Sequence, residues 1–170
     1  MTSIIKVDQI QNAAGGVPTA GDLGINTTGN VIDVKYVALT STQLFSSASY
    51  VDVNNASITV TPASSSSKFL VICGCQYYLK DNYSGWQAFG LRLVRGSTEL
   101  INDSSYGVAM FNNPSSFYLM GKTSQAYLDS PATASSITYK AQGTLNNANH
   151  ASISVNQYGH GYMIIQEIAG

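Results

Sequence analysis

The sequence predicts an all-β protein, a β-sandwich or barrel preceded by a short extended N-terminal segment. From residue 31 onward the chain consists of short runs rich in Val, Ile, Tyr, Phe and Thr, separated by clusters of Ser, Asn, Gly and Pro. No convincing amphipathic helix appears in this part of the chain. The 170 residues, 44% of them apolar, are enough for one domain core. We therefore expect an N-terminal segment and Gly-rich stem over residues 1–30 and a β-sandwich head over residues 31–170.

The N-terminal segment is too short to fold alone. Ile4, Val7 and Ile10 lie three residues apart and are followed by a stretch of Gly, Ala, Asn and Thr. A segment of about ten residues cannot stabilise itself as a helix or a strand in water. We expect these three side chains to dock on another surface, with the stem as a tether.

The first strands of the head are predicted by alternation. Residues 31–39 place Ile32, Val34, Tyr36 and Ala38 on one face. Two strands follow, over residues 49–53 and 56–62, and the second has Ile58 and Val60 inward. Pro62 ends it, because proline cannot donate to a ladder, and the serines at 64–67 form a loop.

Residues 69–79, FLVICGCQYYL, form the most apolar run in this part of the chain. The run is apolar on both faces at its centre, which predicts a central strand covered on each side. Cys73 and Cys75 point to the same core, about 6.5 to 7 Å apart at the backbone, at or beyond the limit of disulfide geometry. We expect two buried, reduced cysteines, because a metal or redox role would need a second pair that the sequence lacks.

The remaining strands bring the total to about nine or ten. Residues 86–101 predict a hairpin with its turn at residues 95–98. Four further strands are predicted within residues 115–124, 135–145, 151–158 and 161–168. The last strand has little polar surface and should lie inside a sheet. Strands at this spacing are typical of a sandwich or a barrel.

Composition argues against several classes of function. Only 10% of the residues are charged, the formal net charge is -1, and no Lys/Arg cluster occurs, so we expect no nucleic acid partner. No apolar run approaches the roughly 18 residues of a membrane span, so we expect no membrane insertion. Phosphate loops, nucleophile elbows and paired acids are also lacking, which predicts neither an enzyme nor a cofactor.

Histidine and loop carboxylates leave two metal alternatives open. The two histidines are His150 and His160, and His160 lies between two glycines. If three chains met on an axis there, three imidazoles could hold a metal, although a tight turn explains the glycines equally well. A calcium site built from loop carbonyls is the other alternative. We expect no metal in the single chain.

Aromatic side chains in two loop-like stretches, residues 80–87 and 104–116, are candidates for recognition. They cover the ends of the sandwich or pack between subunits, or else they form an exposed surface where rings lie against sugars and neighbouring Asn, Asp and Ser bind hydroxyls. The candidate receptor contacts are Asp81, Asn82, Tyr83, Trp86, Tyr106 and Phe111.

Four segments carry a resemblance to a known family. Residues 3–26 (SIIKVDQIQNAAGGVPTAGDLGIN), 45–71 (FSSASYVDVNNASITVTPASSSSKFLV), 129–142 (DSPATASSITYKAQ) and 164–170 (IIQEIAG) resemble successive pieces of tail-fibre and virion structural proteins of bacteriophages of marine bacteria, notably cyanobacteria. The resemblance implies a homotrimeric virion appendage with a short N-terminal attachment segment and a head similar to tumour-necrosis-factor-like jelly rolls. Residues 78–127 lie outside it, and receptor choice is expected there.

Together these observations predict a non-enzymatic virion protein, a short trimeric tail fibre that attaches through Ile4, Val7 and Ile10 and presents its head to a host. The apolar surplus of residues 69–79 and 162–168 also predicts a trimer. Expected partners are other tail or capsid proteins and a host surface glycan or protein, with the tail a more expected location than the capsid surface. The alternatives are a capsid-decorating protein without a receptor role and a lectin-like glycan-binding module.

Overall fold

The computed structural model describes residues 11, 14–17, 28–81, 85–104, 107–112, 117–146 and 152–170. Several predicted residues lie outside this part of the chain: Ile4, Val7, Ile10, Asn82, Tyr83, Tyr106 and His150. For Asp81, Trp86 and Phe111 the description covers the backbone alone.

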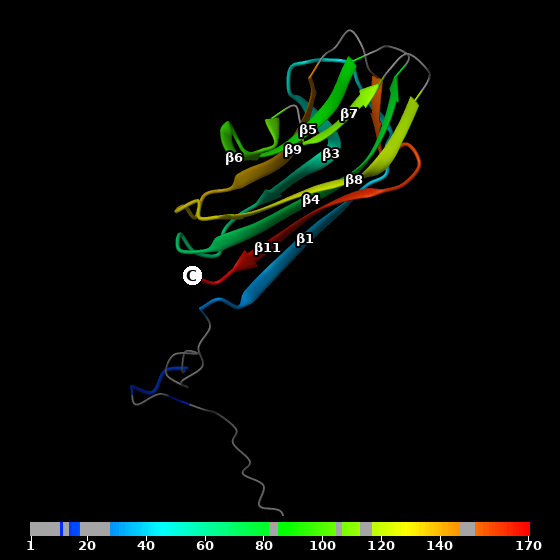
Figure 1. Cartoon of the computed structure of the whole chain (residues 1–170). Helices are drawn as coiled ribbons and strands as arrows, with labels where there is room; N and C mark the ends of the chain where they lie inside the picture. Colours follow the sequence, from blue (N-terminus) through cyan, green and yellow to red (C-terminus); the bar gives the residue numbers. More distant parts are fainter. Residues whose placement is uncertain are drawn as a thin grey trace, which may run out of the picture.

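The described residues form eleven strands, which Figure 1 shows in two layers. In chain order they are β1 (Val31–Leu39), β2 (Gln43–Phe45), β3 (Val51–Val60), β4 (Lys68–Asp81), β5 (Gly85–Arg95), β6 (Thr98–Asn102), β7 (Val108–Asn112), β8 (Phe117–Asp129), β9 (Ile137–Leu145), β10 (Ser152–Val155) and β11 (Gly161–Ile168). No helix of four or more residues occurs among the described residues.

Two antiparallel sheets make the sandwich. Sheet A has the order β1-β11-β4-β10-β2, and β8 pairs with the other edge of β4. Sheet B has the order β3-β9-β5-β6, in which β6 pairs with residues 92–95 of β5. β7 pairs with the earlier part of β5, residues 85–89. The chain changes sheet between β2 and β3, β3 and β4, β4 and β5, β7 and β8, β8 and β9, and β9 and β10. This connectivity confirms the predicted jelly-roll-like β-sandwich.

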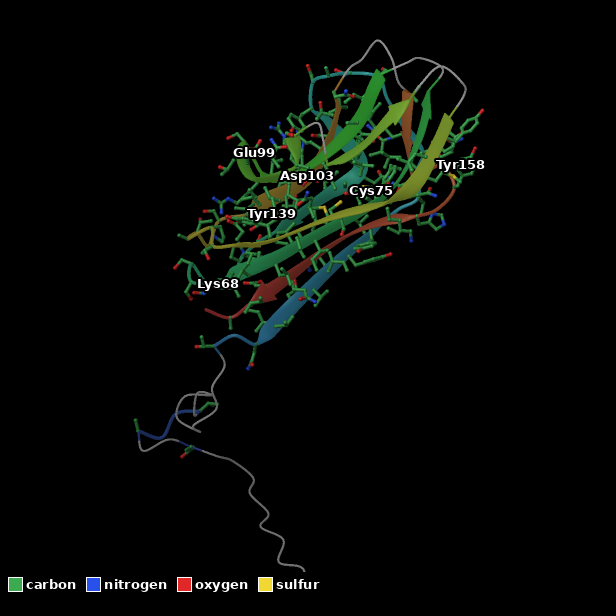
Figure 2. All side chains as sticks on the ribbon, viewed as in Figure 1. Lys68, Cys75, Glu99, Asp103, Tyr139 and Tyr158 are labelled. Atoms are coloured by element: carbon green, nitrogen blue, oxygen red, sulfur yellow. The ribbon has the colours of Figure 1, made fainter. Side chains whose placement is uncertain are left out.

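The core lies between the inner faces of the two sheets. Phe45 and Phe89 meet edge to face with ring centroids 5.4 Å apart, and Phe69 packs on Tyr139 at 5.8 Å. Alternation along β3 and β4 places the predicted inward residues in this core: Ile58, Val60, Phe69, Val71, Cys73 and Cys75. Both cysteines are free thiols, as expected, and Figure 2 shows Cys75 between the sheets.

Three expectations about strands were wrong in part. Residues 49–53 and 56–62 contribute to one strand, β3, in which Asn55 at φ 64° interrupts the register with β9. Strands β2 and β7 were not expected. β4 is central, between β8 and the β10–β11 edge, but no described element covers its outer face.

The two ends of the sandwich carry different parts of the chain. At the proximal end, the Gly29 amide donates to the Ala169 carbonyl (2.7 Å) and the Ala169 amide to the Asn30 carbonyl (2.9 Å), so both termini of the head meet there (Figure 1). At the distal end lie the last residues of β4, β7 and β9 and the first residues of β5, β8 and β10. There the backbone N–H of Ala88 donates to Asn146 Oδ1, and the backbone N–H of Asn146 donates to the carbonyl of Ala88.

Candidate binding surface

The outer face of sheet A carries an apolar patch made of two rows across four strands. Partners in an antiparallel ladder point to the same face, so the register defines the rows. One row is Tyr36, Ile164, Ile72 and Ala126, and the next is Val34, Gln166, Leu70 and Leu128. We call these residues, without Gln166, the apolar patch.

The apolar patch is open to solvent. Tyr36 is 65% exposed, Val34 and Leu128 are each 52% exposed, and Leu70, Ile72 and Ile164 on the central strands are half-buried. No charged side chain stands in either row. No described part of the chain lies over it. A contiguous, uncharged patch of this kind is typical of a surface that another molecule covers.

Towards the distal end, the same face has a groove lined by tyrosines. This tyrosine groove, about 860 Å³ in volume, is lined by Gln76, Tyr78, Tyr118, Met120, Gly121, Lys122 and Tyr158. The rings of Tyr78 and Tyr118 stack at 5.8 Å and 19°, and the ring of Tyr158 stands at 81° to Tyr78 at 5.2 Å. Tyr118 and Tyr158 are 51% and 62% exposed, and Figure 2 shows Tyr158 on the outside of the sandwich.

Gln76 and Asn156 hold Tyr158 over the sheet. Between β10 and β11 the chain leaves the ladder with Asn156 at φ 59°. The backbone N–H of Asn156 donates to the backbone carbonyl of Gln76 (2.9 Å), and the backbone N–H of Gln76 donates to Asn156 Oδ1 (3.2 Å). The Tyr158 amide donates to Gln76 Oε1 (2.9 Å). These three bonds fix the segment from both sides, so the position of Tyr158 is set before any ligand arrives.

The groove holds Tyr78 as a hydrogen-bond donor and has one charged residue in its lining. Desolvation, followed by the charges of Tyr158 and Tyr118, raises the pKa of Tyr78 above its ordinary 10.0. The Tyr78 hydroxyl therefore remains a hydrogen-bond donor at neutral pH. Lys122 is the single charged residue among those lining the groove.

Three of the six predicted receptor residues are described, Asp81, Trp86 and Phe111, and they are strand residues at the distal end, not loop residues as expected. Asp81 is the last residue of β4 and pairs with Phe117. Trp86 and Phe111 belong to β5 and β7 and are direct cross-strand partners, so the structure brings this pair together at the backbone. Asn82, Tyr83 and Tyr106 lie outside the described residues.

Sequence reasoning missed the tyrosine groove. One signal was available: alternation from Cys73 and Cys75 puts Tyr78 on the opposite, outer face of its strand. The approach of Tyr118 depends on the β4–β8 register, and that of Tyr158 on the break after β10. Neither has a local sequence signature.

One buried polar cluster has a structural role. Arg95 Nη1 donates to both carboxylate oxygens of Asp129 (2.8 and 2.7 Å), and the Tyr139 hydroxyl donates to Asp129 Oδ2 (2.7 Å). The three residues come from β5, β8 and β9, so they join the two sheets. Both oxygens of the Asp129 carboxylate therefore have hydrogen-bond donors.

The described part of the chain contains neither a cluster of metal-ligating side chains nor a membrane-spanning helix. No three His, Cys, Asp or Glu side chains gather there as a metal site would need. His160 is exposed, and the glycine after it allows a close approach, because a Cβ on Gly161 would lie 2.5 Å from the Gly74 carbonyl oxygen. No helix within the described ranges is long and apolar enough to cross a membrane.

Comparison with known proteins gives a structural likeness only. No protein-family model and no curated protein matches the sequence. Among solved structures, the chain is similar to VP2 of infectious bursal disease virus in a subviral particle, at 9% identity and a TM-score of 0.38 over 81% of this chain. A second similar structure is the T13 particle of the same virus, at 11% identity and a TM-score of 0.40 over 84% of this chain. The chain spans 38% and 36% of those two chains. TM-scores and identities this low say nothing about the function of this chain.

Proposed function

We propose that this chain is a non-enzymatic virion structural protein, a short tail fibre with a homotrimeric head. The observation that carries the proposal is the uncovered apolar patch on sheet A. A second copy of the chain is a suitable partner for it, because the patch holds no charge that self-association would have to pair or bury. The resemblance of four sequence segments to phage tail-fibre and virion proteins supports the trimer and its place on a virion.

The arrangement of the two ends fits a fibre. Residues 1–27 join the head at the proximal end, where Gly29 and Asn30 pair with Ala169. The candidate receptor residues Asp81, Trp86 and Phe111 belong to the distal end. A head tethered at one end would thus present the other to a host.

Three tethered copies make weak N-terminal contacts sufficient. If Ile4, Val7 and Ile10 of each copy dock on the virion, binding of the first segment raises the effective concentration of the other two. Short apolar contacts that would be transient singly then hold the trimer.

The oligomeric state of the purified chain tests the trimer. Light scattering should give three times the 18.0 kDa chain mass. Leu128→Asp places a charge in the apolar patch and should yield monomers, whereas the control Ser57→Asp, exposed on the outer face of sheet B, should leave the trimer intact. A monomeric wild-type chain at micromolar concentration would overturn the trimer.

A reconstruction of the intact virus particle tests the location. Density for the head on the tail supports the fibre. Density on the shell would instead favour a capsid-decorating protein.

A further inference from the structure

The tyrosine groove exposes ring faces beside hydrogen-bonding groups. Tyr118 and Tyr158 are each more than half exposed. The lining also offers hydrogen-bonding groups: the hydroxyls of the three tyrosines, the side-chain amide of Gln76 and the ammonium of Lys122. We propose that the tyrosine groove binds a saccharide. Its role as a host receptor rests on the proposed function, but binding itself does not.

A pyranose matches this lining better than a wholly apolar ligand. One face of such a ring presents C–H groups, and its edge presents hydroxyls. Tyrosine combines an apolar ring with a polar tip, so it can contact both. The volume of about 860 Å³ lies within the roughly 300 to 1,000 Å³ of small-ligand sites, and an extended groove suits a short oligosaccharide.

The side of the groove nearest the apolar patch carries a cation. Gln76 and its ladder partner Lys122 line the groove there, and one row of Ala38, Tyr162, Gly74 and Ser124 lies between them and the patch. A protein interface continued into the groove would have to bury the Lys122 ammonium, which is costly without a partner carboxylate. A hydrated saccharide leaves that ammonium in contact with water.

The groove is organised in advance. The Gln76 and Asn156 bonds fix the backbone at Tyr158, and Tyr78 contacts the rings of both Tyr118 and Tyr158. A ligand therefore orders few groups when it binds, which reduces the entropic cost of association.

Lys122 predicts a preference among saccharides. As the one charged residue of the lining, it can pair with a carboxylate on the ligand. A uronic acid should therefore bind more tightly than a neutral sugar of the same size.

Titration calorimetry with the full-length protein tests the site. The probes are a glucuronic acid trisaccharide, maltotriose and N-acetylchitotriose at millimolar concentration. We expect the glucuronic acid probe to bind best, and the double variant Tyr118→Ala, Tyr158→Ala to weaken its binding at least about tenfold, equivalent to about 1.4 kcal/mol. Lys122→Gln should remove the preference for the acidic probe over the neutral ones.

Tyr127→Ala is the matched control, because Tyr127 is also on β8 and 36% exposed but lies outside the groove. It should bind as the wild type does. Thermal unfolding verifies that all variants are folded.

Three results would overturn the saccharide site: wild-type protein that binds none of the probes, a double variant that binds as tightly as wild type, or a double variant that turns a wild-type trimer into monomers. The last would assign the groove to the subunit interface. The mass of the wild-type protein is measured separately, so failure of the trimer and failure of the saccharide site are distinguishable.

Discussion

Asp129 of sheet A makes a buried polar contact with two residues of sheet B. Its carboxylate is buried and accepts hydrogen bonds from Arg95 and Tyr139, whereas the Asp52–Lys140 pair has the same 2.7 Å separation but is exposed. Removing one partner of a buried ion pair leaves the other charge unpaired, while an exposed pair contributes little. We predict that Asp129→Asn lowers the free energy of unfolding by about 2 to 3 kcal/mol and Asp52→Asn by less than about 1 kcal/mol.

Urea unfolding at one fixed protein concentration measures both variants, since self-association would otherwise shift the midpoint. Equal losses for the two would show that Asp129 does not join the sheets as described.

Tyr139 makes the fold sensitive to alkali. Burial, followed by the hydrogen bond to Asp129 and its charge, raises the pKa of Tyr139 far above its ordinary 10.0. Above pH 10 the unfolded chain loses this proton and the folded chain keeps it, so stability is fully present below that pH and declines as the pH rises. Each further pH unit should cost up to about 1.4 kcal/mol from this group.

Tyr139→Phe removes the titrating group. The variant should start about 1 to 2 kcal/mol less stable at pH 7, because Asp129 loses a donor, yet its stability should fall less steeply between pH 10 and 12. Parallel pH profiles for the variant and the wild type would contradict this assignment.

Cys73 and Cys75 should be inert thiols in the folded protein. The hydrogen bond that the Cys73 thiol makes to Cys75, and then burial, raise the pKa of Cys73 well above 9.0, and Cys75 is buried beside it. Thiolate is the reactive form, so a thiol reagent should modify these residues only after denaturation. Rapid labelling of the native protein at pH 8 would show that the core opens locally.

At the scale of the strands, glycines make room for rings from a neighbouring strand. A Cβ on Gly143 of β9 would lie 2.7 Å from the Phe89 ring and 2.8 Å from the Phe45 ring, both buried in the core. On Gly74 of β4 it would lie 2.8 Å from Tyr162, whose ring is on the outer face of sheet A and half-buried. The crowding is similar, but only the outer ring has solvent to move into.

We therefore predict that Gly143→Ala destabilises the head by about 1 to 3 kcal/mol through overpacking, and that Gly74→Ala costs clearly less. Thermal unfolding of the two variants compares them directly. A larger loss for Gly74→Ala would mean that the outer face is packed as tightly as the core.

Strand positions could be predicted from sequence where the signal is local. Alternation alone placed Ile58, Val60 and Cys73 inward, because side-chain direction along a strand depends only on neighbours in sequence. The same rule put Val34 and Tyr36 on a common face but could not say that this face is exposed. Which face is covered depends on the partner sheet, which lies far away in the chain.

The candidate binding surface was harder to predict, for a physical reason. Tyr78 and Tyr118 stack because β4 and β8 pair in one register, and a shift of one residue would send Tyr118 to the other face. Trp86 and Phe111 were assigned to loops because Gly, Asn and Ser surround them, although backbone pairing between β5 and β7 makes them strand residues. Strand pairing between segments far apart in the sequence thus determines structure that local composition does not predict.

For the whole molecule, the contact between residues 29–30 and Ala169 decides how much of the N-terminal segment can be deleted without loss of stability. Gly29 and Asn30 bond Ala169 beside β11, so they belong to the folded head. Deleting residues 1–12 should leave the melting temperature and the trimer unchanged. Deleting residues 1–30 should lower the free energy of unfolding by about 1 to 3 kcal/mol, because two backbone hydrogen bonds are lost.

The shorter deletion also separates attachment from folding. If Ile4, Val7 and Ile10 dock the trimer on the virion, protein without residues 1–12 should fold but be missing from purified particles. Immunoblotting of the particles for this protein, with a capsid protein as the loading reference, measures its copy number. Full-length protein with these three residues changed to Ser should behave in the same way, because the apolar side chains and not the length of the segment provide the contact. Particles that carry either variant at normal copy number would show that the head, through its patch or its distal end, is what binds the virion.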